Sequence, residues 1–264
     1  MSGIGFGIGM LLLGVGVGLI SNIVGLGGGV LMVPAFMTFV PEMDAYTAKG
    51  TSLFIIVFVS AMNAWRLHRN VPDKPWRMAG WLAVGAMTGG YLTAWLTSWL
   101  PEQVILGTFL ALVFALAIQM FLLKPLEAHR GIPTRNPLLT VPIGVISGAV
   151  GGATGTGGGA VLVPLALRFG LSTNERVVGL SNLVMVPMSV AGSIAHLLAA
   201  PAYHGPGTVG HVNMYLVPVV FIGALLGSPL GRYVNARLTL RRRKVVLGVL
   251  LLLIAARMLQ QMVY

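Results

Sequence analysis

The stretch GLGGGVLMVP, from Gly25 to Pro34, places a run of consecutive glycines inside an otherwise apolar part of the chain. A related stretch, GTGGGAVLVP, runs from Gly155 to Pro164, 130 residues further on. A glycine destabilises a helix interior by up to about 1 kcal/mol relative to alanine, so each run predicts a break in a helix. A break that recurs at equivalent places predicts that the chain consists of two related halves.

The composition indicates which solvent surrounds these breaks. Hydrophobic residues make up 56% of the 264 residues and charged residues only 9%, whereas a soluble domain holds about 25% charged residues. A membrane-spanning helix needs about 20 mainly apolar residues, and the chain contains several such runs. The sequence therefore predicts an all-α polytopic membrane protein. The first run begins at Gly3 with no basic residue before it, so we do not expect a cleaved signal peptide.

Charge and cysteine content exclude several other classes of protein. A formal net charge of +11 suits a nucleic-acid partner only where the basic residues form one face of a soluble module. Here they lie between apolar runs, so we expect no nucleic-acid partner and interpret them as markers of membrane orientation. The absence of cysteine excludes disulfides, thiolate metal ligands and a cysteine nucleophile.

The apolar runs form two similar series. The first half is expected to hold a hairpin over residues 3–40 and spans over 51–65, 76–100 and 104–123; the second half is expected to hold a hairpin over 138–169 and spans over 177–200, 212–234 and 245–263. The two repeats are then residues 1–123 and 138–264, joined by a polar cytoplasmic linker, 124–137.

The second arm of each hairpin is short. Residues 30–40 supply about 11 apolar residues, which at 1.5 Å per residue reach only about half of a hydrocarbon core roughly 30 Å thick. We therefore expect two broken-helix hairpins whose short arms are half-helices that enter from opposite faces. Their glycine-rich tips would then meet near the membrane midplane.

The basic residues predict how the two halves are oriented, because Lys and Arg accumulate in short cytoplasmic loops. The loop at 66–77 is basic, whereas its counterpart at 200–211 carries no charged residue; the next pair of loops, 101–103 and 232–244, shows the opposite asymmetry. Equivalent loops are thus expected on opposite sides, which defines an inverted-topology repeat.

This orientation predicts where the protein resides. Both termini would be external or periplasmic, in a multi-pass protein of a bacterial-type inner (plasma) membrane. Every basic residue except Lys49 and Arg257 would then be cytoplasmic.

The helix breaks are the expected site of function. The first N–H groups of a half-helix and the helix dipole both favour an anion, so two such ends could bind one without a buried cation. Polar residues at the tips and at the starts of the following spans would donate to its oxygens. The expected substrate-binding residues are Asn22, Gly25, Gly27, Gly28, Gly29, Thr51, Ser52, Thr154, Thr156, Gly157, Gly158, Gly159, Ser181, Asn182 and His196. Lys49 and Arg176 are expected to attract anions at the entrances.

Each of these assignments has a purely structural alternative. Glycines also serve close helix packing, as expected for Gly14 with Gly18 and for Gly223, Gly227 and Gly231. Hydroxyl and amide side chains often bond back to their own helix. A lysine or arginine near a helix end often extends its charge to the interface.

The acidic residues argue against cation transport. They are Glu42, Asp44, Asp73, Glu102, Glu127 and Glu175, and all fall in expected loops or at span ends. Carboxylates that relay protons or bind cations inside a membrane are expected deeper in the spans. With no metal-ligand cluster and no nucleophile beside a base, we expect no enzyme activity and no cofactor.

The glycine motifs, each followed by Val-Pro, together with KGTSL (49–53) and GLSNL (179–183), resemble the TauE/SafE family of membrane permeases. The resemblance covers almost the whole chain and implies transport of sulfite, of an organosulfonate such as sulfoacetate, or of another small organic anion. The sequence then predicts an alternating-access secondary transporter that binds its anion between the two tips. An anion channel, a carboxylate permease of the same architecture and a non-transporting membrane subunit are the alternatives. Its partners would be the anion and the lipid bilayer, with a homo-oligomer possible.

Overall fold

The computed structural model describes residues 3–24, 28–69, 75–122, 136–173, 176–201, 203–237 and 240–263. Ten helices and one short hairpin occupy these residues. They are α1 (Gly3–Val24), α2 (Gly29–Phe39), α3 (Ala45–His68), α4 (Trp76–Thr97), α5 (Glu102–Leu122), α6 (Pro137–Thr154), α7 (Gly159–Arg168), α8 (Val177–Leu197), β1 (Thr208–Val209), β2 (Val212–Asn213), α9 (Leu216–Arg237) and α10 (Leu240–Val263). The protein is thus an all-α polytopic membrane protein, and the two expected half-helices are the 11-residue α2 and the 10-residue α7.

Helix α3 begins at Ala45, earlier than the predicted start at Thr51. Its N-terminus is capped twice, because the carboxylate of Asp44 accepts from the Thr47 N–H at 2.6 Å and that of Glu102 accepts from the Ala45 N–H at 2.7 Å. Side chains that satisfy the first N–H groups of a helix favour a helix start at that point. The stretch KGTSL therefore lies inside α3 and not at its beginning.

Two of the predicted spans end too late because a proline follows them. Helix α4 ends at Thr97 and α8 at Leu197, whereas the prediction extended them to residues 100 and 200. Pro101 and Pro201 lie just beyond, and the residue before a proline avoids helical geometry.

The last two helices begin at places that differ from the prediction. Helix α9 begins at Leu216 and not at 212, because Val212 and Asn213 form strand β2. The Asn213 side-chain oxygen accepts from the Leu216 N–H at 3.3 Å and so caps the helix. Helix α10 begins at Leu240 and not at 245, because its basic residues are good helix formers that extend it at the start.

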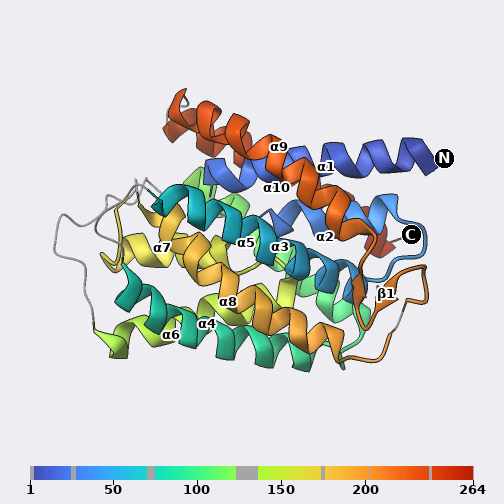
Figure 1. The fold of residues 1–264 in the computed structure, drawn as a ribbon, viewed down its shortest axis with the longest axis horizontal. Coiled ribbons are helices and arrows are strands. Elements are labelled where there is room, and N and C mark those ends of the chain that lie inside the picture. The colour runs from blue at the N-terminus through green and yellow to red at the C-terminus, as the bar shows by residue number, and fades with distance from the viewer. Residues whose placement is uncertain are drawn as a thin grey trace.

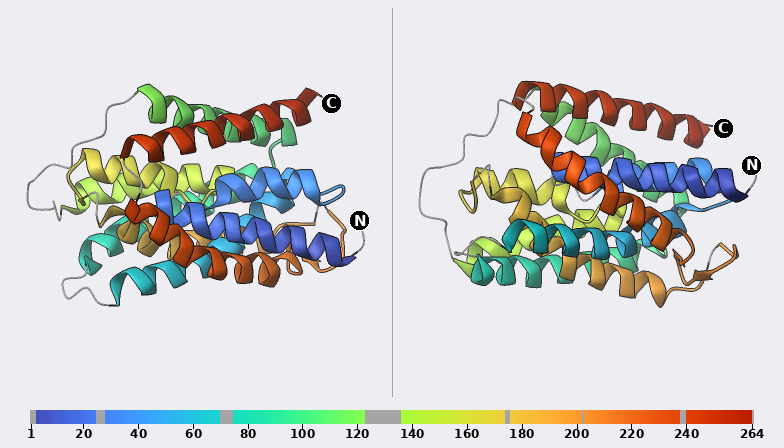
Figure 2. Two further views of the ribbon diagram at one scale, coloured as in Figure 1. Left: turned by 90° about the horizontal axis from the view of Figure 1, so that it is seen from above. Right: turned by 45° about the horizontal axis from the view of Figure 1, so that its top comes forward.

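Helices from the two halves of the chain pair with one another (Figures 1 and 2). Helix α1 packs along α9, α4 along α6, α3 along α8, and α5 along α10. Helices α3 and α8 are central, since 67% of each apolar span is buried, against 39% for α1 and 33% for α5. If the helices of the two halves are matched in chain order, α1 corresponds to α6 and α4 to α9, so the α1–α9 pair corresponds to the α6–α4 pair.

Both termini lie at one end of the bundle, which we call the terminal end (Figure 1). Helix α1 runs inward from this end, and α2 returns toward it from the middle of the molecule. Helices α6 and α7 form the corresponding hairpin from the opposite end. Among the described residues, five helices are long and apolar enough to cross a membrane, namely Gly5–Ile23, Ala45–His68, Glu102–Gln119, Pro137–Thr154 and Val177–Leu197.

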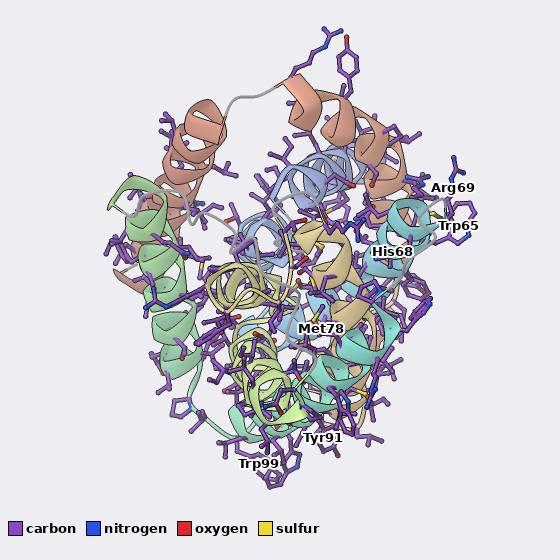
Figure 3. All side chains as sticks on the ribbon, turned by 90° about the vertical axis from the view of Figure 1, so that its left-hand side faces the viewer. Trp65, His68, Arg69, Met78, Tyr91 and Trp99 are labelled. Carbon is purple, nitrogen blue, oxygen red and sulfur yellow. The ribbon has the colours of Figure 1, made fainter. Side chains whose placement is uncertain are left out.

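Figure 3 looks onto the opposite end, where α3 finishes. Trp65 and Arg69 lie at the periphery of this view, and the guanidinium of Arg69 lies 5.5 Å from the Trp65 ring centre. His68 points inward, and a ring nitrogen lies 3.0 Å from the carbonyl oxygen of Ala64 in its own helix. His68 also faces the start of α8, since a Cβ on Gly179 would lie 2.9 Å from its ring.

Scattered glycines allow the paired helices to touch backbone to backbone. A Cβ on Gly14 or Gly18 of α1 would collide with the backbone of α9, and a Cβ on Gly223 or Gly227 of α9 would collide with that of α1. The glycines of α4 and α6 meet in the same way. Small residues at such positions are the usual means of close helix packing in membranes, so the packing interpretation of these glycines is confirmed.

We predict that Gly14→Ala lowers the apparent melting temperature of the detergent-purified protein, whereas Gly16→Ala does not. The methyl group at position 14 would press on the backbone of Val220 and Gly223, and overpacking costs about 1–3 kcal/mol. At Gly16, two residues away on the same helix, no described atom apart from the adjacent backbone of α1 lies within 4 Å of the added Cβ. Equal losses in both variants would contradict the α1–α9 contact.

Candidate functional site

The two glycine tips touch each other in the interior. A Cβ on Gly29, the first residue of α2, would lie 2.5 Å from the carbonyl oxygen of Gly155 and 2.6 Å from the Cα of Thr156. The start of the first half-helix therefore rests directly on the second tip, as the sequence predicted. Gly25 and Gly27 lie outside the described residues, so the first tip is seen only from Gly28 onward.

The second tip requires glycine for its backbone shape. Gly155, Gly157 and Gly158 have φ of 75°, 83° and 75°, a left-handed conformation that residues with a side chain rarely adopt. Gly155 ends α6 in this conformation, and Gly158 precedes the first residue of α7. The consecutive glycines thus let the chain leave one helix and enter the next within a few residues.

Gly28 and Gly158, which hold the same position in the two motifs, also allow close packing. Gly28 precedes α2 with a φ of 76°, and a Cβ there would lie 2.5 Å from Cγ1 of Val17. A Cβ on Gly158 would lie 2.5 Å from the carbonyl oxygen of Ser147. Both glycines therefore have a structural reason that does not involve a ligand, and substitutions there cannot by themselves separate binding from folding.

Hydroxyl groups surround the second tip. Ser52 of α3 donates to the Gly155 carbonyl at 2.8 Å, and the hydroxyls of Thr154 and Thr156 lie 2.9 Å apart. Thr154 also donates to the Val150 carbonyl of its own helix at 2.6 Å. The structure therefore gathers three of the expected substrate-binding residues, Ser52, Thr154 and Thr156, at one buried place.

Lys49 lies beside the same tip and not at an entrance. Its side chain is fully buried, and its ammonium donates to the hydroxyl of Thr97 on α4 at 2.5 Å. A Cβ on Gly155 would lie 2.5 Å from the Lys49 Cγ, so the lysine stem packs on the turn. Within the described ranges, no carboxylate forms an ion pair with this ammonium. Burial of a charge without a counter-charge is costly, which makes this place receptive to an anion.

The residues at the start of the first tip belong to a different network. Asn22 donates to the side-chain oxygen of Asn63 on α3 at 3.2 Å, and Asn63 donates to the Ser21 hydroxyl at 3.3 Å. Ser228 of α9 donates to the same Asn63 oxygen at 3.4 Å. Asn63 and Ser228 are not among the residues expected from the sequence, although an amide inside an apolar span is a signal that could have identified Asn63.

The remaining expected substrate-binding residues of α3 and α8 do not lie together. Thr51 accepts from the Asn213 N–H at 2.8 Å and thereby anchors the β hairpin. Asn182 donates to the Val178 carbonyl of its own helix at 2.8 Å, and its buried side-chain oxygen has no partner among the described residues. Ser181 lies 3.5 Å from the sulfur of Met185, whose methyl group would meet a Cβ on Gly157 at 2.8 Å. The face of α8 that carries Ser181 therefore reaches the second tip.

Arg176 and His196 lie at opposite ends of α8. Arg176 is exposed at the N-cap, which suits the predicted place at an entrance. His196 is fully buried near the terminal end, where its Nδ1 lies 3.3 Å from Nδ1 of His211. His211 is not among the residues expected from the sequence, because the short hairpin that carries it has the sequence pattern of a loop.

The described acidic residues lie at helix ends, as predicted. Asp44 and Glu102 cap α3, and Glu42 is exposed in the turn before it, with a φ of 58°. Asp73, Glu127 and Glu175 lie outside the described residues.

Spans that cross the membrane and interrupted helices that meet inside the bundle define a membrane transport protein. Residues 10–258 match the family model described as "Sulfite exporter TauE/SafE", and the chain belongs to this family. The probable membrane transporter protein YunE of Bacillus subtilis is 24% identical over 97% of this chain and 98% of its own length. YdhB of the same organism, also a probable membrane transporter protein, is 29% identical over 90% and 91% of the two chains. No solved structure matches.

We predict that Ser52→Ala destabilises the protein whereas Ser60→Ala does not. Removal of the Ser52 hydroxyl leaves the buried Gly155 carbonyl without that donor, which costs about 1–3 kcal/mol. Ser60 is equally buried on the same helix, but its hydroxyl has no partner among the described residues. Chemical or thermal unfolding of the two variants in detergent measures the difference, and a neutral Ser52→Ala would show that the tip does not depend on α3.

Proposed function

We propose that the protein is a secondary transporter of a small anion, most simply sulfite or an organosulfonate such as sulfoacetate. The anion would bind by alternating access between the two glycine tips, beside Lys49. The observation that carries the proposal is the buried ammonium of Lys49, which has no carboxylate partner among the described residues and packs on the turn at Gly155. The description of the family as a sulfite exporter supports a sulfur oxyanion.

The surroundings of Lys49 suit an oxyanion in three ways. The hydroxyl of Thr156 is buried at the same turn and can donate to an anion oxygen in place of Thr154, whose own hydroxyl already donates to the Val150 carbonyl. Half-helices α2 and α7 both begin at the tips, where their dipoles favour negative charge. The carboxylates of Asp44 and Glu102 are held at the N-terminus of α3 by its N–H groups, so they do not neutralise the lysine. A bound anion would supply the missing counter-charge.

The proposed orientation follows from the described basic residues. Arg69, Arg77, Arg168, Arg176 and Arg237 lie in helix ends or turns at the end opposite the termini. That end would be cytoplasmic, which places both termini outside and makes the two halves inverted repeats. The equivalent α1–α9 and α4–α6 pairs support this arrangement.

We predict that Lys49→Met weakens anion binding without loss of stability. Loss of a hydrogen bond to a charged group is worth about 1.5–3 kcal/mol, or roughly a 10- to 150-fold weaker affinity. Methionine fills much of the same space without a buried charge. Thermal-shift titrations with sulfite, methanesulfonate, sulfoacetate and acetate measure both quantities, because a ligand of the folded state raises its melting temperature.

Arg257→Met is the matched control for this experiment, because it removes an exposed cation from α10. It should leave anion affinity unchanged. If none of the four anions stabilises the unmodified protein, the proposed function is wrong. If Lys49→Met binds them as tightly as the unmodified protein does, the site lies elsewhere.

The orientation predicts opposite accessibility of two positions. Thr173, between α7 and α8, and His204, before β1, are both exposed and lie at opposite ends of the bundle. In the cysteine-free chain, His204→Cys should react with an impermeant thiol reagent added to intact cells, and Thr173→Cys should react only after the membrane is opened. Labelling of both from outside would contradict the proposed topology.

A further inference from the structure

Two histidines from different elements meet near the terminal end of the central helices. His196 lies in the last turn of α8, and His211 lies in the turn between β1 and β2, with 3.3 Å between their Nδ1 atoms. His196 is 0% and His211 3% exposed. Two ring nitrogens at this distance share one proton, since one nitrogen has to donate and the other has to accept.

The backbone around the pair holds the two rings in place. The His211 N–H donates to the His196 carbonyl at 2.9 Å, and the next strand is anchored to Thr51 of α3. Gly50 allows this close approach, because a Cβ there would lie 3.1 Å from Cβ of His196 and would collide with the His211 carbonyl. The pair is therefore part of a fixed junction between α3, α8 and the hairpin.

The pair connects a surface pocket to a buried atom that lacks a partner. His211 lines a pocket of about 560 Å³ together with Tyr46 and Trp95. The pocket opens to the surface, because two of its other lining residues, Trp99 and Leu198, are each 76% exposed. At the other side of the pair, Nε2 of the buried His196 has no hydrogen-bond partner among the described residues. A buried polar atom of this kind calls for an explanation.

We propose that the His196–His211 pair is the proton-binding site of the transporter, so that one proton accompanies each anion. This inference rests on the proposed anion transport, to which it adds the coupling ion. The proton passes from water in the pocket to a ring nitrogen of the pair. A single added proton leaves one donor and one acceptor between the rings, whereas a second would place two N–H groups face to face. The pair therefore binds one proton at a time.

The other titratable groups around the pair come from three elements. They are Asp44, Tyr46 and Lys49 at the start of α3, Glu102 at the start of α5, and Tyr91 of α4 across the pocket. Burial lowers the pKa of His211, the nearby carboxylate of Asp44 and a hydrogen bond with the backbone of Ala200 raise it, and the charge of Lys49 lowers it. His211 therefore stays neutral near pH 7 until a change nearby favours its protonated form.

Lys49 supplies the coupling between anion and proton. Its charge lowers the pKa of His211 and so opposes protonation of the pair. An anion bound beside Lys49 offsets that charge and thereby favours the protonated pair. Such coupling is reciprocal, so a proton on the pair must raise the affinity for the anion by the same factor.

The test measures protons taken up when an anion binds to the purified protein. Methanesulfonate is the probe, because it stays a monoanion between pH 5 and 8 and any proton taken up has to come to the protein. Calorimetric titrations at several pH values, each in buffers of different ionisation enthalpy, give the affinity and the number of protons. We expect uptake that approaches one proton per anion, and an affinity that rises by up to about tenfold per pH unit as the pH falls.

Three variants locate the proton. His196→Gln and His211→Gln should each bind methanesulfonate without proton uptake and with little dependence of affinity on pH. His204→Gln, an exposed histidine of the same connection outside the pair, should behave like the unmodified protein. Apo melting temperatures show whether each variant is folded, and if His196→Gln is not, His211→Gln decides.

Each outcome decides the question. Binding without proton uptake in the unmodified protein would overturn the proton site and leave anion transport intact. Uptake that persists in the folded histidine variants would also overturn it, because the proton would then reside elsewhere, for example on Lys49. If neither methanesulfonate nor sulfite, sulfoacetate or acetate binds at any pH, the proposed function fails and this inference fails with it.

Discussion

The structure depends on one constraint, which is that a helix broken inside a membrane has to satisfy its backbone groups within the protein. The second tip meets this requirement in a compact way. Its left-handed glycines turn the chain from α6 to α7, Ser52 donates to the buried carbonyl of Gly155, and the start of α2 covers the turn. Bulky side chains on these residues would separate the elements that shield the break. The glycine triplets are therefore first a solution to backbone burial, and any role in binding is built on that solution.

The same requirement explains why helices pair between the two halves of the chain. The α1–α2 and α6–α7 hairpins need protein on every side of their tips, and α3 and α8 supply it from the centre of the bundle. The outer pairs α1–α9 and α4–α6 then close around this centre through glycine faces that leave almost no space between backbones. Such contacts are rigid in register, because a shift of one residue would bring a side chain against a carbonyl.

Helix α3 links the polar parts of the interior. Near its start it carries Lys49 and Ser52 beside the second tip, and further along it carries Asn63, which connects Ser21 and Asn22 of the first hairpin to Ser228 of α9. The first group contains a buried charge, whereas the second is a network of neutral amides and hydroxyls. This difference suits a functional site in the first place and a structural one in the second, since an uncompensated buried cation is retained at a cost.

The sequence by itself determined the class of protein, the helical segments and the two breaks. Hydropathy and glycine act locally, so α1, α2, α6 and α7 fall close to the predicted ranges. Local signals are weaker at helix ends. One cap of α3 comes from Glu102 on another helix, and strand β2 occupies residues that were expected to belong to α9. Only the tertiary structure decided that Lys49 is buried, that Asn63 joins three helices and that His211 meets His196, because each of these facts depends on residues that are far apart in the sequence. Charge pattern and spacing show which residues are polar, but the packing of α3 against α8, α2 and α9 decides which of them lose their water.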